Sequence, residues 1–146
     1  MSGRHVWLRC LGVACACFGM CGPPAAVSQT SAKPPNGIAG VYGQQAAGHD
    51  WVRIVKKRDA SFGVSLKLYY ANGHTCQLNQ EGEWKDDHLA VVADGLDPNA
   101  PCQLQVFSRG GRILLKDEGL RCAPVYCGTR GKLDGVSLPK AAAHTQ

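Results

Sequence analysis

The sequence predicts an all-β domain, a small antiparallel meander that closes into a barrel of roughly eight strands and is held by two disulfides. Three observations support this fold class. Short runs alternate apolar and polar residues, turn residues separate these runs about every 8–12 residues, and no run has the period of an amphipathic helix. Glycine is also frequent, at 18 of 146 residues, which suits a chain with many tight turns.

The clearest strand is residues 61–70, SFGVSLKLYY. Every second residue is apolar and belongs to one face, formed by Phe62, Val64, Leu66, Leu68 and Tyr70. This period of two is typical of a half-buried strand. Asn72-Gly73 then favours a tight turn with positive φ, and residues 74–84, HTCQLNQEGEW, form the return strand.

Further strands are expected at residues 40–44, 50–56, 89–94, 102–108, 112–117 and 132–139. Short loops between them predict hairpins that follow one another along the chain. Closure of such a meander removes its unpaired edges, which favours a barrel over an open sheet. A barrel of this size is filled by its own side chains.

Residues 1–28 have the order of parts of a secretory signal peptide. Arg4, His5 and Arg9 form a basic region, residues 10–21 are uncharged and mostly apolar or small, and Ala26-Val27-Ser28 suits cleavage after Ser28. The apolar run is too short to span a bilayer, which needs ~20 residues. Lipoprotein processing at a cysteine of this segment is the alternative, so a lipid anchor stays open as the less favoured reading.

The rest of the chain divides into three parts. Residues 29–37 are polar and rich in proline, which predicts a flexible leader. Residues 38–139 form the single β domain, and residues 140–146 are expected to be a disordered tail. Export predicts a periplasmic or secreted protein with no transmembrane segment.

Removal of the signal peptide leaves four cysteines, Cys76, Cys102, Cys122 and Cys127. An even number of cysteines in an oxidising compartment predicts two disulfides. The order of the hairpins places all four cysteines at one rim of the barrel, and we favour the pairs Cys76–Cys102 and Cys122–Cys127. A zinc site is the alternative, but zinc ligands are usually closer in sequence, so no metal is expected.

The mature chain keeps 14 basic side chains against 11 acidic ones, a formal charge near +3. This charge is mild, and no basic stripe is interleaved with aromatic residues, so no nucleic-acid partner is predicted.

No pattern in the sequence indicates catalysis, so the protein is not expected to be an enzyme or to need a cofactor. The chain lacks a Gly-x-Ser-x-Gly nucleophile motif. Asp86-Asp87-His88 falls in a predicted turn, where solvated side chains are the simpler explanation. Asp117, Glu118 and Asp134 are expected near the cysteine rim, but the sequence predicts no cleft between them.

The segment 121–132, RCAPVYCGTRGK, is the candidate binding site. A disulfide would make this segment rigid, and a preorganised loop loses little entropy when it docks. Its predicted binding residues are Tyr126, Thr129, Arg130 and Lys132, because tyrosine and arginine are frequent interface anchors and arginine pairs with carboxylates. The alternative is that Arg130 and Lys132 only keep the rim soluble while Tyr126 packs over the barrel end.

The stretches ANGHTCQLNQEGEW, CQL and RCAPVYCGTRGKLDGVSLP resemble a C-terminal region of exported bacterial proteins. Some of those proteins also carry an LprI-type lysozyme-inhibitor domain. The resemblance covers about residues 38–139, and a weaker one links the chain to the MliC-type lysozyme inhibitors. It implies an inhibitor of lysozyme or of another cell-wall hydrolase.

These observations together predict an exported binding protein whose partner is a protein, with a cell-wall hydrolase as the leading candidate. Two alternatives remain. One is an envelope protein with a structural or small-ligand-binding role, which an interior cavity would favour. The other is an immunity protein against a toxin that acts in the periplasm.

Overall fold

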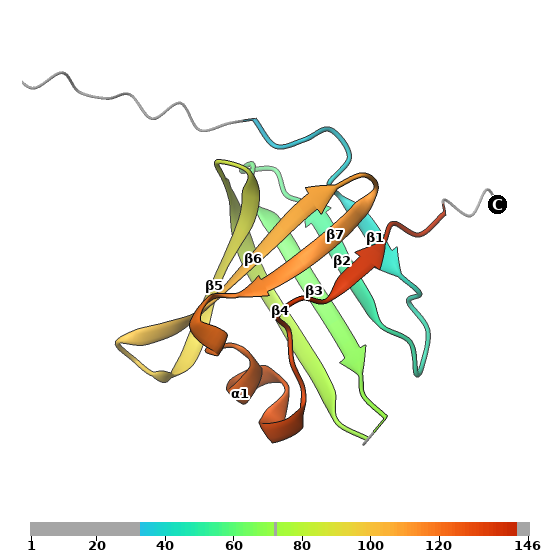
Figure 1. Cartoon of the computed structure of the whole chain (residues 1–146). Coiled ribbons are helices and arrows are strands. Elements are labelled where there is room, and N and C mark those ends of the chain that lie inside the picture. Colours follow the sequence, from blue (N-terminus) through green and yellow to red (C-terminus); the bar gives the residue numbers. More distant parts are fainter. Residues whose placement is uncertain (1–32, 72, 143–146) are drawn as a thin grey trace, which may run out of the picture.

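The computed structural model describes residues 33–71 and 73–142. The predicted signal peptide, the first residues of the leader, Asn72 of the predicted turn and the end of the tail lie outside these ranges. Eight antiparallel strands follow one another in chain order, so the predicted fold class is confirmed (Figure 1). They are β1 (Gly40–Gly43), β2 (Trp51–Lys56), β3 (Phe62–Tyr69), β4 (Thr75–Lys85), β5 (His88–Asp97), β6 (Ala100–Arg109), β7 (Arg112–Asp117) and β8 (Ser137–Pro139).

The end of the chain brings β8 next to β1, so the sheet is almost closed into a barrel. Tyr42 of β1 forms an isolated antiparallel bridge with Lys140, and the Ala141 N–H donates to the Val41 carbonyl at 2.8 Å. The Lys140 ammonium also donates to the Ala39 carbonyl at 2.9 Å. Lys140 and Ala141 are therefore part of the barrel, although the sequence places them in the tail.

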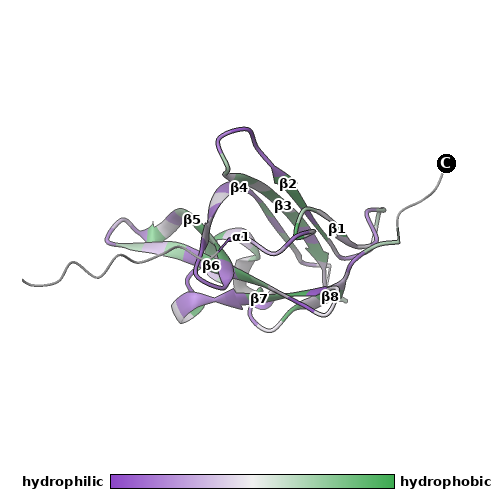
Figure 2. Cartoon of the chain, turned by 90° about the horizontal axis from the view of Figure 1, so that it is seen from above, coloured by the Kyte–Doolittle hydropathy of each residue, from purple (hydrophilic) through white to green (hydrophobic). Residues whose placement is uncertain are grey.

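Inward-facing side chains fill the barrel. In β3 the burial alternates strictly, with Phe62, Val64, Leu66 and Leu68 all buried, as the sequence predicts. Figure 2 shows β2, β3 and β4 along one side of the molecule and β7 and β8 along the opposite side. Full burial of each large apolar side chain between these walls contributes roughly 1.5–3 kcal/mol.

The strands β4 and β5 pair over only part of their length. Residues 82–85 of β4 pair with residues 88–91 of β5. Before that point β4 pairs only with β3, and beyond it β5 pairs only with β6. The two strands diverge toward the end of the barrel that carries α1 (Figure 1). Gly82 lies where they separate, and a Cβ there would come 2.8 Å from the Ala90 carbonyl oxygen, so the strands approach closely only because the residue is glycine.

Three short helical turns connect β7 to β8, where the sequence predicts an irregular loop. They are η1 (Glu118–Leu120), α1 (Ala123–Tyr126) and η2 (Gly128–Arg130). Pro124 lies in the first turn of α1, where its missing N–H leaves no hydrogen bond unmade. Within the described ranges no helix is long and apolar enough to cross a membrane.

Candidate binding site at the cysteine end of the barrel

Two disulfides join the segment between β7 and β8 to the barrel. Cys127 is bonded to Cys76 at the start of β4, and Cys122 is bonded to Cys102 near the start of β6. All four cysteines lie at one end of the barrel, as predicted, and all four are buried. The predicted pairs Cys76–Cys102 and Cys122–Cys127 are wrong.

The structure gives a physical reason for each wrong pair. Ala93 of β5 pairs directly with Cys102, so β5 still lies between β4 and β6 at this level and keeps Cys76 away. Cys122 and Cys127 flank the turn α1, and helical geometry sets residues five apart at about 8.7 Å between Cα atoms. A disulfide requires a separation below about 7 Å.

The observed pairing makes α1 a bridge across the end where β4 and β5 have separated. One end of α1 is attached to β6 and the other to β4, and the helix packs against both β4 and β5. The Tyr126 hydroxyl donates to the Asp94 carbonyl of β5 at 3.3 Å. The segment 121–132 is therefore rigidly held, although by two disulfides to the barrel and not by one disulfide within itself.

Asp117, at the end of β7, fixes the beginning of α1. Its side chain is buried, and it accepts the backbone N–H groups of Cys122 and Ala123, each at 2.9 Å. The Asp117 N–H in turn donates to the Asp134 side chain at 3.1 Å. The two aspartates lie near the cysteine rim, as expected, and their contacts are structural.

A second group of contacts fixes the end of the segment. The Tyr70 hydroxyl donates to the Lys132 carbonyl, and Tyr70 Oη lies 3.8 Å from Cys76 Sγ. Burial raises the pKa of Tyr70. A Cβ at Gly131 would lie 2.5 Å from Cys127 Cβ and 3.0 Å from Cys76 Sγ, so only glycine fits against this disulfide.

The predicted binding residues occupy different positions on the segment. Arg130 and Lys132 are exposed, whereas Tyr126 is half-buried and packs against the core. Thr129 belongs to η2, but its side chain lies outside the described part of the structure. Arg121 adds a third exposed cation at the start of the segment. The rigid segment thus presents basic side chains to solvent.

The structure adds an apolar residue that the sequence does not single out. Leu120 is 62% exposed and has a φ of 55°, directly after Gly119 with a φ of 65°. Positive φ is rare for a bulky residue, and no sequence pattern indicates it. Together with Val125, which is also exposed, Leu120 places apolar surface beside Arg121.

The other residues considered for chemistry lie apart from this segment. Asp86-Asp87-His88 forms the turn region between β4 and β5, where His88 Nδ1 lies 3.2 Å from an Asp87 oxygen and the His88 ring packs on Phe107. Among the described residues, no three histidine, cysteine or acidic side chains are arranged to hold a metal ion.

The fold and this site define a small disulfide-bonded β-barrel domain with a helical bridge at one end. Comparisons of the chain with protein-family models, with curated proteins and with solved structures give no match.

Proposed function

We propose that this protein is an exported binding protein that blocks a cell-wall hydrolase such as a lysozyme, with segment 121–132 as its docking surface. The observation that supports this most is the attachment of the segment to β4 and β6 by two disulfides. A surface that is already rigid loses little conformational entropy when a partner binds.

The charge of the segment suits a partner with an acidic cleft. Arg121, Arg130 and Lys132 are exposed, and within the described residues no carboxylate forms an ion pair with any of them. Glycoside hydrolases work with a pair of carboxyl groups across a cleft. A guanidinium that enters such a cleft can pair with a carboxylate through two parallel hydrogen bonds.

The proposal includes a periplasmic or secreted location. Two disulfides are compatible with an oxidising compartment, and the first 28 residues have the pattern of a signal peptide. The filled barrel favours protein binding over the carriage of a small ligand in the interior. An immunity role would use the same surface against a different partner.

The test is a titration of the oxidised, exported protein against lysozymes and other cell-wall hydrolases. We expect inhibition at micromolar concentration, and Arg130→Ala should weaken it by roughly tenfold because a charge-assisted hydrogen bond is lost. Arg109→Ala is the matched control, since Arg109 is exposed at the β6–β7 turn, and it should inhibit like the parent protein. Failure of every hydrolase to respond at micromolar protein would overturn the proposal.

A further inference from the structure

Leu120 lies in a short turn that is fixed at both ends. The turn joins Asp117, at the end of β7, to Cys122, which is bonded to Cys102 of β6. The Asp117 carboxylate also accepts the Cys122 N–H at 2.9 Å, so the two ends of the turn are held together. A turn held in this way loses little conformational entropy when a partner binds to it.

The backbone of this turn is unfavourable for the residue that it carries. Gly119 and Leu120 have φ values of 65° and 55°. Two successive residues with positive φ are found in the type I′ turn, where Gly, Asn and Asp are preferred because a bulky L-residue is strained in this conformation. Strained residues of this kind gather at ligand-binding sites, where the position of the side chain matters more than its effect on stability.

The Leu120 side chain does not stabilise the fold by burial. It is one of the large apolar side chains that are exposed, and it belongs neither to the buried core nor to the partly buried residues packed against that core. Val125, on α1, is the other exposed large apolar residue of this region. The turn therefore presents a leucine to solvent at a position where neither the backbone nor the core favours it.

The Arg121 guanidinium lies over the same turn. A Cβ placed on Gly119 would come 3.2 Å from Arg121 Nε and 3.7 Å from Arg121 Cζ, so the guanidinium is close to the Gly119 backbone. The nearby Glu118 carboxylate lies 3.6 Å from the Lys116 ammonium, and in the part of the chain that the structure describes it forms no ion pair with Arg121. An exposed apolar side chain and an exposed guanidinium thus lie side by side.

We propose that Leu120 is the apolar anchor of the docking surface and that Arg121 is its charged neighbour in the complex. Leu120 enters an apolar hollow at the edge of the hydrolase cleft, and the Arg121 guanidinium pairs with a carboxylate of that cleft. Substrate clefts offer both features, because they are lined mostly by apolar and aromatic side chains with a few polar groups. This inference rests on the proposed function and adds one specific contact to it.

The variant Leu120→Asn separates binding from folding. Asparagine tolerates positive φ, so the midpoint of thermal unfolding should rise by a few degrees. Inhibition of the hydrolase that responds to the parent protein should weaken about tenfold, because the burial of one leucine side chain is lost from the complex. A leucine that only stabilised the turn would give the opposite result, with stability and inhibition falling together.

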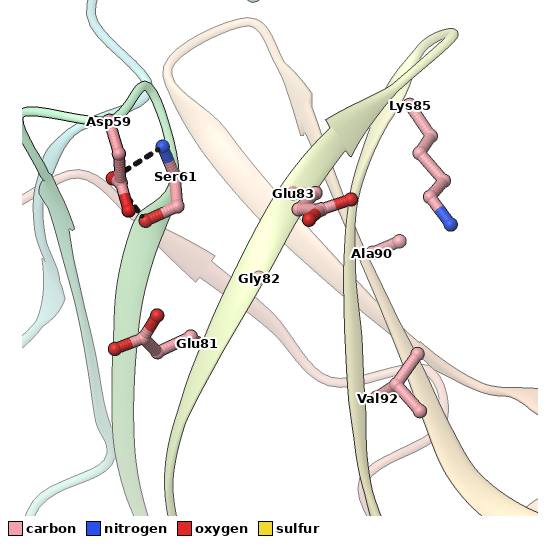
Figure 3. Close-up of a pocket in the computed structure, with 8 residues that line it drawn as sticks. All are labelled: Asp59, Ser61, Glu81, Gly82, Glu83, Lys85, Ala90 and Val92. Atoms are coloured by element: carbon pink, nitrogen blue, oxygen red, sulfur yellow. Dashed lines mark hydrogen bonds between the residues drawn. The ribbon is translucent and has the colours of Figure 1, made fainter.

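Ala60→Asn is the matched control. Ala60 also has a positive φ, of 66°, and lies between Asp59 and Ser61, whose hydrogen bonds are shown in Figure 3. It precedes β3, at the end of the barrel opposite to the cysteines. This variant should be at least as stable as the parent protein, and its inhibition of the hydrolase should be unchanged.

Sodium chloride gives a second measurement. The loss caused by Leu120→Asn should be the same at about 50 and about 300 mM salt, whereas the loss caused by Arg121→Ala should shrink, because salt screens charges. Unchanged inhibition by Leu120→Asn, a lower unfolding midpoint of this variant, or a loss that depends on salt would each overturn this inference alone. Absence of inhibition by the parent protein would overturn the proposed function, and this contact with it.

Discussion

Asp117 and Cys122 are joined by a hydrogen bond of 2.9 Å from the Cys122 backbone N–H to the buried Asp117 carboxylate. The second oxygen of the same carboxylate accepts the Ala123 N–H. One buried side chain at the end of β7 thus orients both the disulfide to Cys102 and the first turn of α1. A helix of this length is not stable on its own, because nucleation of a helical turn is unfavourable without such contacts.

Asp117→Ala should destabilise the protein by about 3 kcal/mol, because it leaves two N–H groups of the α1 start without their charged acceptor. Asp117→Asn keeps one amide oxygen as an acceptor and should cost about half as much. Chemical denaturation of the oxidised proteins measures both values. Equal stability of the alanine variant and the parent would contradict a holding role for this carboxylate.

The sequence predicts the fold well because the strands of the barrel show as a local alternation of apolar and polar residues. The pattern of 61–70 is the burial pattern of β3, and the hairpin order correctly places the four cysteines at one end. The pairing of the cysteines depends on how far β5 extends between β4 and β6. The alternation of apolar and polar residues does not show where β5 ends. The stretch after residue 94 has the glycine and prolines of a loop, yet β5 continues to Asp97 with an irregular register.

The helical bridge could not be predicted from periodicity for a different reason. The turn α1 has four residues, fewer than two turns of helix, so no repeat of apolar positions can form. Its stability comes from the nearby Asp117 carboxylate and from long-range contacts. The Tyr126 hydrogen bond and the two disulfides join it to residues 20 to 51 positions away in the sequence. The positive φ of Leu120, 55°, likewise matches no sequence pattern that favours it.

Removal of either disulfide should destabilise the protein by about 3–4 kcal/mol, since the two bonds close chain segments of 51 and 20 residues. The double variant Cys76→Ala/Cys127→Ala should lose slightly more than Cys102→Ala/Cys122→Ala, because the longer closed segment restricts the unfolded chain more. Thermal unfolding compares them. Peptide mapping without reductant should recover the pairs Cys76–Cys127 and Cys102–Cys122, and recovery of any other pair would contradict the structure.

Gly131→Ala should destabilise the protein by about 1–3 kcal/mol, because its Cβ would overlap Cys127 Cβ and crowd the Cys76–Cys127 disulfide. Gly63→Ala is the matched control. A Cβ at Gly63 would meet Lys57 Cε at 3.6 Å and the Val55 carbonyl oxygen at 3.9 Å, both ordinary contacts, so stability should stay the same or rise slightly. Urea denaturation measures both changes, and equal effects of the two substitutions would show that the disulfide does not crowd Gly131.

Tyr70 should make the stability of the protein depend on alkaline pH. Burial raises its pKa, so the folded state favours the protonated hydroxyl, which donates to the Lys132 carbonyl. Its contribution is therefore complete below the ordinary tyrosine pKa of about 10 and is lost as the pH rises through the higher pKa of the folded state.

Tyr70→Phe removes this hydrogen bond and should cost about 1 kcal/mol at neutral pH. The difference in the free energy of unfolding between the parent and Tyr70→Phe should then shrink as the pH rises above about 10. Burial also raises the pKa of Tyr42, but that residue is present in both proteins and its effect cancels in the difference. Unfolding curves recorded across this pH range measure the difference, and a value that stays constant would show that the Tyr70 hydroxyl does not hold Lys132 in solution.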